Sequence, residues 1–141
     1  MSKAMADKWF SWSVRCSAGW KCQRCGKQFE PPTTQLQCSH LFSRKHNITR
    51  WHPNNAFAHC ASCHAWLESR PPEFAAWATD FLGTERYESL RKYHNRITKL
   101  SKSDFKVIAD HYRAEYDRMS GPEYGFYAEH KLANHPLAEE E

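Results

Sequence analysis

Two Cys-x-x-Cys pairs place the strongest constraint on what this chain can fold into. Cys22 and Cys25 form the first pair, Cys60 and Cys63 form the second, and 34 residues separate the pairs. Each pair can occupy a turn that directs two thiolates at one point, and four thiolates complete the tetrahedron that zinc prefers. Four thiolates leave no open coordination position, so the sequence predicts a structural Zn²⁺ that holds the ends of the intervening segment together.

The alternative for these pairs is redox chemistry, because C-x-x-C thiols also exchange disulfides. Neither pair is surrounded by the strands and helices of a thioredoxin-like domain, and Gly26 after the first pair is typical of a zinc knuckle. Two further cysteines, Cys16 and Cys38, lie outside the pairs. We expect each to be a small buried residue, with an additional metal ligand as the alternative.

Composition and charge narrow the class of protein. The chain has 141 residues, of which 40% are hydrophobic and 26% charged, and it contains no apolar stretch near the roughly 18 residues of a membrane span. Its first residues lack the apolar run of a secretory signal, so we expect a cytoplasmic protein without membrane contact, in which cysteines stay reduced. The net charge of +4 favours a polyanionic partner such as DNA.

Local patterns predict an α+β chain of two short strands followed by helices. The aromatic residues near the N-terminus predict a segment that packs against the rest of the chain. The expected elements are strands at 36–41 and 56–58, a helix between Cys60 and Pro71, a helix from Pro72 to Gly83, a helix from Thr84, and a helix capped by Ser103 that runs towards Gly121. We divide the chain into a core at 1–70, a helical extension at 71–120 and a tail at 121–141 that is expected to be partly disordered.

A pattern of histidine and asparagine lies between and just after the cysteine pairs. His40 is followed after 14 residues by Asn55, and after 8 more by His64, which directly follows Cys63. Phosphodiester hydrolysis requires a deprotonated water, and a neutral imidazole can accept that proton near pH 7. His40 is therefore the candidate general base. One divalent ion could neutralise the charge that builds on the phosphate and on the leaving oxygen.

This arrangement resembles the HNH, or ββα-metal, nuclease family, in which a histidine, an asparagine and a final histidine or asparagine directly after C-x-x-C recur in this order. The resemblance covers residues 22 to about 68. It implies a small zinc-stapled ββα-metal core followed by a helical C-terminal region, and a metal-dependent DNA endonuclease. It also implies that His64 binds a catalytic Mg²⁺ or Mn²⁺, and that Asn55 orients the His40 loop or shares the metal's environment.

The chain departs from the HNH pattern at one position. Many HNH enzymes carry an aspartate or histidine directly before the base, as a metal ligand, whereas Ser39 stands here and a hydroxyl is a poor substitute. His46, His52 or His59 could supply the missing ligand, or the ion could be held chiefly by His64 and the substrate. Each of these three histidines could equally be an ordinary loop or packing residue.

The flanking sequence is similar to the NinG (Rap) family of phage recombination proteins. The matching motifs, over most of residues 10 to 118, are Phe10-Ser-Trp-Ser-Val-Arg15, His40-x-x-Ser43-Arg44, Asn55 with Cys60-x-x-Cys63, Gly83-Thr-Glu-Arg-Tyr-Glu-Ser-Leu90, and Tyr112-Arg-x-Glu-Tyr116. The resemblance implies a phage or prophage nuclease that is selective for branched DNA, such as D-loops and four-way (Holliday) junctions. In that family asparagine is common where this chain has His64.

Basic residues provide candidates for DNA contacts. Arg44, Lys45 and Arg50 lie in the segment that passes the predicted active site, where guanidinium groups can clamp phosphates. Arg91 and Lys92 belong to the helical extension, whose basic residues could grip duplex arms or could be a solvated surface balanced by acidic residues. Symmetric cutting of a four-way junction would call for two active sites and hence a homodimer.

The sequence is also compatible with two other functions. One is a zinc-bound DNA-binding adaptor that keeps the fold without catalysis, which Ser39 would favour and His40 would oppose. The other is an HNH nicking enzyme of phage packaging or restriction, which substrate preference would distinguish.

Overall fold

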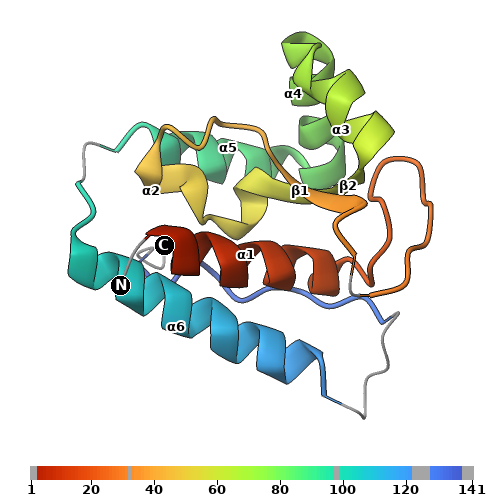
Figure 1. Cartoon of the computed structure of the whole chain (residues 1–141). Coiled ribbons are helices and arrows are strands. Elements are labelled where there is room, and N and C mark those ends of the chain that lie inside the picture. Colours follow the sequence, from red (N-terminus) through yellow and green to blue (C-terminus); the bar gives the residue numbers. More distant parts are fainter. Residues whose placement is uncertain (1–2, 32, 97–98, 122–127, 138–141) are drawn as a thin grey trace.

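The computed structural model describes residues 3–31, 33–96, 99–121 and 128–137. It confirms an α+β chain, in which helices surround a sheet of two antiparallel strands (Figure 1). Its elements are α1 (Lys3–Ser17), β1 (Leu36–His40), α2 (Asn47–Arg50), the short 3-10 helix η1 (Pro53–Asn55), β2 (Ala56–Cys60), α3 (Ala61–Glu68), α4 (Pro71–Leu82), α5 (Thr84–His94) and α6 (Lys102–Met119).

The β1–β2 hairpin and α3 lie at the centre of the sequence motifs. Leu36 pairs with Cys60 at one end of the hairpin and His40 pairs with Ala56 at the other. Side chains alternate across a strand, so residues at even positions share one face of the hairpin and those at odd positions share the other. Both predicted strands are confirmed, and the short helices α2 and η1 lie in the connection between them, for which no element was predicted.

Helix α1 lies against one face of the hairpin, and α6 packs along α1 in the same direction, on the side away from the strands (Figure 1). Phe10 of α1 contacts Tyr112 of α6 with ring centroids 4.8 Å apart, and the hydroxyl of Ser13 donates to the Tyr112 carbonyl. Trp51, fully buried, joins the same cluster from the connection between the strands. The N-terminal segment therefore packs, as expected, and it shares a hydrophobic core with the last long helix.

Helices α3, α4 and α5 form a second apolar cluster on the other face of the hairpin. Phe57 of β2 packs there with Leu67 of α3, Phe74 of α4 and Leu90 of α5. Gly83 separates α4 from α5 with a φ of +82°, a conformation that side chains with a Cβ rarely adopt. The glycine thus ends one helix and allows the chain to turn into the next.

The cap of α6 differs from the sequence prediction. Ser101, not Ser103, precedes the helix, and its hydroxyl accepts from the backbone N–H of Asp104 while the Asp104 carboxylate accepts from the Ser101 N–H. This reciprocal capping box satisfies two backbone donors, which explains why the helix begins earlier than predicted.

The C-terminal segment 128–137 packs against the helices. The His130 N–H donates to the Ser17 carbonyl, and the Ala133 N–H donates to the Glu115 carboxylate of α6. The remaining parts of the predicted disordered tail, 122–127 and 138–141, lie outside the described residues. None of the helices described combines the length and the apolar character that crossing a bilayer requires.

Candidate metal centre and histidine site

The four predicted zinc ligands come together. The Sγ atoms of Cys22, Cys25, Cys60 and Cys63 all lie within 4.8 Å of one another, and those of Cys25 and Cys60 are 3.8 Å apart. Four sulfurs bound about 2.3 Å from one ion would be separated by roughly 3.8 Å. The cluster could therefore hold a metal ion, and it lies where the first cysteine pair meets the junction of β2 and α3.

Backbone geometry positions the first pair beside the second. The chain reverses at Gly26, whose φ of +81° suits a residue without a Cβ, and the Gly26 N–H donates to the Cys22 carbonyl. Gln23 links this turn to β2, because its N–H donates to the Ala58 carbonyl and its Oε1 accepts from the Ala58 N–H. The turn is thus attached to the strand that leads directly into Cys60.

The two other cysteines have different surroundings. Cys16 is buried in α1, and burial raises the pKa of its thiol. Cys38 is half-buried on the α1 face of β1, and desolvation raises its pKa to about 12. Both thiols therefore stay protonated near pH 7. Cys16 is a small buried residue, as expected, whereas Cys38 is only half-buried.

His40, at the end of β1, is held by a backbone carbonyl. Its Nε2 lies 2.9 Å from the Arg50 oxygen, and because a carbonyl only accepts, Nε2 carries the proton of the neutral ring and Nδ1 keeps the lone pair. Burial lowers the pKa of His40 to about 4, although the carbonyl bond partly opposes this. The ring is therefore neutral near pH 7. It lines a cavity of about 260 Å³ between α1 and β1, together with Arg44.

Asn55 closes the connection between the two strands. Its Oδ1 accepts from the Phe42 N–H at 2.7 Å, and its Nδ2 donates to the carbonyls of Phe42 and Thr49 at 3.0 and 2.9 Å. The side chain is completely buried, so each of these bonds replaces contact with water. This geometry suits the predicted role in orienting the loop that follows His40.

His64, in the first turns of α3, has the arrangement of a ring that could bind a cation. Its Nδ1 lies 2.6 Å from Oε1 of Gln37, an acceptor, so Nδ1 carries the proton and Nε2 keeps its lone pair. Glu68, one helical turn later, places a carboxylate oxygen 3.9 Å from that Nε2. Nε2 of His64 and the Glu68 carboxylate could therefore contribute two ligands to one ion.

His40 and Gln37, the residue that contacts His64, are neighbours on β1. They are three residues apart on the strand, and both line the cavity between α1 and β1. The His40 ring lies 5.9 Å from Phe10 of α1. Among the described side chains, His40 and His64 share no hydrogen bond or ring contact. The structure thus joins Asn55 to the His40 loop and Glu68 to His64.

The candidates for the missing metal ligand near Ser39 have other environments. Ser39 itself is completely buried. His46 is exposed and contacts the His94 ring. His52 is buried and its Nδ1 accepts from the Asn54 N–H.

His59 is buried in an aromatic pocket. Its ring centroid lies 4.7 Å from that of Trp77 and within about 6 Å of Phe57 and Phe74. Burial lowers its pKa to about 3, and neither ring nitrogen has a hydrogen bond within the described part of the chain. This environment is that of a packing residue.

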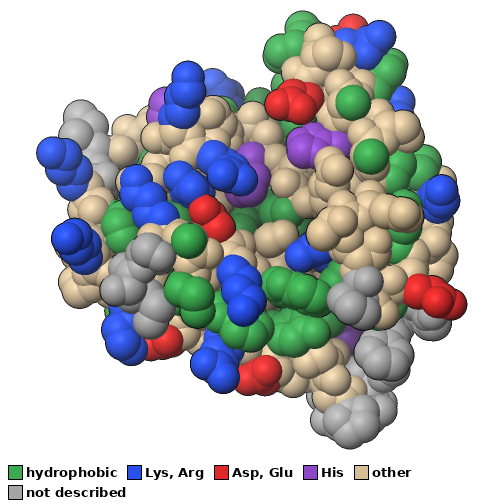
Figure 2. Space-filling model, viewed as in Figure 1, with side chains coloured by type: hydrophobic (Ala, Val, Ile, Leu, Met, Phe, Trp, Pro, Cys, Tyr) green, Lys and Arg blue, Asp and Glu red, His purple; other side chains and the backbone are tan. Residues whose placement is uncertain are grey.

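Some of the basic side chains predicted to contact DNA are exposed, and others form ion pairs within the protein. Arg44 and Lys45 are exposed, and Lys92 is exposed on α5. Arg50 forms a bidentate ion pair with Asp7 of α1, at 2.6 and 3.0 Å, and Arg91 pairs with Glu88 at 3.2 Å. Figure 2 shows Lys and Arg side chains gathered over α2 and the first half of α1, with histidine side chains beside them.

No protein family model, no curated protein and no solved structure matches this chain. The interpretation of the site therefore depends on the chemistry of its own residues.

Three residues of the site region were missed in the sequence. The i, i+4 spacing of His64 and Glu68 on a predicted helix was the available signal for Glu68. Gln37 and Asp7 had none, because their partners His64 and Arg50 are 27 and 43 residues away in the chain.

Proposed function

We propose that this chain is a metal-dependent DNA endonuclease of the HNH type, which acts on branched DNA such as D-loops and four-way junctions. The observation that carries the proposal is the state of His40, a neutral ring whose Nε2 is occupied by a carbonyl and whose Nδ1 is free to accept a proton. The ββα order of β1, β2 and α3, with four converging cysteines at one end, supports it.

In this proposal His40 takes the proton from the attacking water through Nδ1 while the Arg50 carbonyl fixes the ring. Asn55 keeps the loop after β1 in place, and Arg44 faces the same cavity as His40, where its guanidinium can bind a phosphate. A divalent ion, Mg²⁺ or Mn²⁺, would neutralise charge on the phosphate. His64 and Glu68 are the side chains that would hold it.

The four cysteines would hold Zn²⁺ in a structural role. Three of them are buried, and their positions tie the N-terminal turn to the junction of β2 and α3. A closed set of four thiolates offers no position for substrate, so this site would support the fold and leave catalysis to the histidines.

A second candidate function is a zinc-bound DNA-binding adaptor without catalysis. Ser39 favours it, because this side chain is completely buried and offers no acidic metal ligand beside His40.

Cleavage assays on labelled linear duplex, D-loop and four-way-junction DNA test the proposal, with Mg²⁺, Mn²⁺ or EDTA. We expect metal-dependent cutting of the branched substrates, reduced at least about 100-fold in His40→Ala because a general base contributes roughly that much or more. His46→Ala, an exposed histidine of the same connection, is the matched control and should cut normally.

Two outcomes would contradict the proposal in different ways. Tight binding without cutting under any metal would establish the adaptor function instead. Cutting of linear duplex as fast as branched DNA would keep the HNH chemistry and indicate a nicking enzyme of packaging or restriction.

A further inference from the structure

A large cavity lies away from the histidine site. It is an open groove of about 1180 Å³ between α5 on one side and the end of α6 with segment 128–137 on the other. Its floor is formed by His52, Pro53 and Asn54. It shares no lining residue with the cavity that contains His40, so a ligand in this groove would contact a separate surface.

The groove carries an excess of positive charge. The charged residues that line it are Arg86, Lys92, Arg96, Arg118, Lys131, Glu115 and Glu129. Both carboxylates are already neutralised, since Glu115 pairs with Arg118 at 2.8 Å and Glu129 pairs with Lys21 at 3.7 Å. Arg86, Lys92 and Lys131 therefore add positive charge to the groove beyond these two pairs.

The charged side chains of helix α5 lie on two different sides of the helix. Arg86 and Lys92 face the groove and lie about 9 Å apart along the axis, at 1.5 Å per residue. Glu88 and Arg91, which pair with each other, do not line it. A one-sided basic stripe was not evident from the spacing in the sequence, because the groove side is determined by where segment 128–137 packs.

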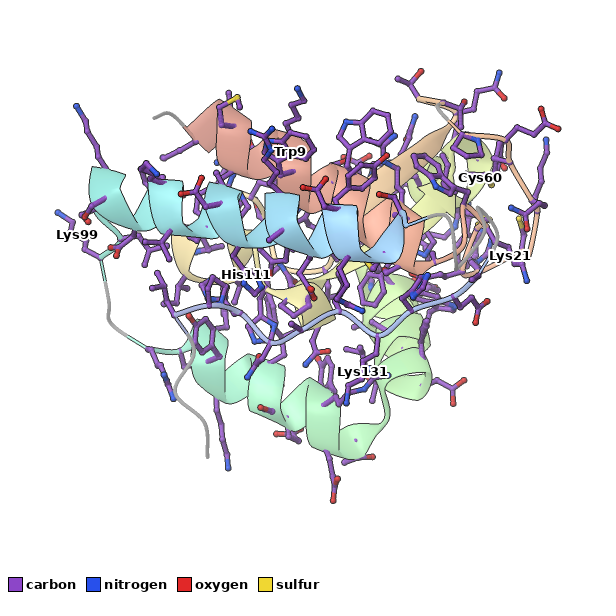
Figure 3. All side chains as sticks on the ribbon, turned by 90° about the horizontal axis from the view of Figure 1, so that it is seen from below. Trp9, Lys21, Cys60, Lys99, His111 and Lys131 are labelled. Atoms are coloured by element: carbon purple, nitrogen blue, oxygen red, sulfur yellow. The ribbon has the colours of Figure 1, made fainter. Side chains whose placement is uncertain are left out.

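The cations reach the groove from both walls. Arg86 is fixed by hydrogen bonds to the carbonyls of Leu82 and Phe81 at the end of α4, which leave its charge uncompensated. Lys131 lies on the side of segment 128–137 that faces α5 (Figure 3). Neither Lys92 nor Lys131 forms an ion pair within the described ranges. Opposed, separated cations of this kind suit a polymer of phosphates rather than one small anion.

We propose that this groove binds the phosphodiester backbone of a second DNA segment, apart from the segment that is cut at His40. The inference rests on the proposed nuclease function and extends it, because two separate DNA surfaces would explain a preference for branched DNA. Contacts to phosphates position a duplex without reading its sequence, so the groove would recognise the arrangement of arms.

Charge reversal on the two walls tests this inference. Binding of a fluorescent four-way junction and of a short linear duplex is measured by anisotropy, over a range of salt concentrations, with the full chain carrying His40→Ala to prevent cutting. Adding Lys92→Glu and Lys131→Glu should weaken junction binding roughly tenfold or more and change linear-duplex binding less than about threefold. The slope of log affinity against log salt should fall by about 2, at roughly 0.9 per lost phosphate contact.

The matched control is Lys99→Glu with Lys102→Glu, which makes the same change in net charge outside the groove. Both lysines are exposed, and Lys99 lies far from Lys131 (Figure 3). An equal loss with the control pair, or an equal loss for linear and branched DNA, would overturn the inference while leaving the nuclease proposal intact. A chain that neither binds nor cuts any DNA would overturn the proposed function itself.

Discussion

The two ends of the β1–β2 hairpin are held by different chemistry. At the cysteine end, four Sγ atoms lie within 4.8 Å of one another, and bringing so many thiolates together is favourable only when a cation compensates their charge. At the histidine end, Asn55 makes three hydrogen bonds to the backbone and His40 bonds the Arg50 carbonyl. These hydrogen bonds are all made between groups of the chain.

In the proposed function, this difference would separate the part of the hairpin that supports folding from the part that carries out catalysis. The cysteine end should fail when its metal is removed, and it contains no open position for chemistry. The histidine end is closed by neutral hydrogen bonds, which can hold a base in place whether or not a catalytic ion is bound. Perturbations directed at one end should therefore have measurable consequences that the other end does not share.

Cys60→Ser should give the largest effect, because it removes one of four ligands at the cysteine end. We expect zinc to be released, with loss of a large part of the roughly 10–16 kcal/mol that structural zinc contributes in small zinc-bound peptides. Metal content per chain and thermal unfolding measure both. Cys38→Ser is the matched control, a cysteine outside the cluster, and should keep its zinc. A Cys60→Ser protein with full zinc and an unchanged Tm would show that the cluster is not a structural zinc site.

Mild acid should loosen the histidine end next. His52, in the connection that Asn55 closes, stacks on His135 with ring centroids 5.9 Å apart, and both are buried. Desolvation lowers the pKa of His52 to about 4, and desolvation with the charges of His52 and His111 lowers that of His135 to about 3, against 6.5 in the unfolded chain. The unfolded state therefore binds more protons, so stability is complete above pH 6.5 and falls as pH drops towards 4.

The size of this acid effect follows from the shifts. At pH 5 each buried neutral ring lowers the free energy of unfolding by about 2 kcal/mol, which gives on the order of 4 kcal/mol for the pair. Denaturant unfolding at pH 7 and pH 5 measures it. His135→Phe should reduce the pH dependence by about 2 kcal/mol, because it removes one buried titrating ring, keeps an aromatic side chain and leaves His52, His40 and His59 with their lowered pKa values. An equally steep pH dependence in His135→Phe would mean that other groups cause the acid sensitivity.

Sequence reasoning predicted the features that depend on short spacings. The cysteine cluster follows from two C-x-x-C turns, and the strands follow from alternation beside them. The cap of α6 was assigned to Ser103, although the Ser101-x-x-Asp104 spacing of a capping box was present. Local patterns were sufficient to predict the cysteine cluster, the strands and the α6 cap. The α6 cap was assigned to the wrong serine because Ser103 was preferred to Ser101.

Features that depend on packing between distant segments could not be predicted. The contact of His64 with Gln37 depends on how α3 packs against the hairpin, and the contact of His40 with Phe10 depends on how α1 does. The ion pair of Asp7 with Arg50, and the groove between α5 and segment 128–137, join parts of the chain that are about 40 residues apart. A single sequence carries no local signal for such contacts.

Asn55→Ala should give the smallest of the three effects and the most specific one. The side chain is completely buried, and its removal leaves the Phe42 N–H and the carbonyls of Phe42 and Thr49 without their partner. Unsatisfied buried groups cost roughly 1–3 kcal/mol, so a loss of about 3 kcal/mol is expected in denaturant unfolding, with zinc retained. Asn54→Ala, at the neighbouring position, keeps these bonds and should lose less than about 1 kcal/mol. Release of zinc from the Asn55→Ala protein would show that the two ends of the hairpin are coupled, because a change confined to the histidine end would then have opened the cysteine end.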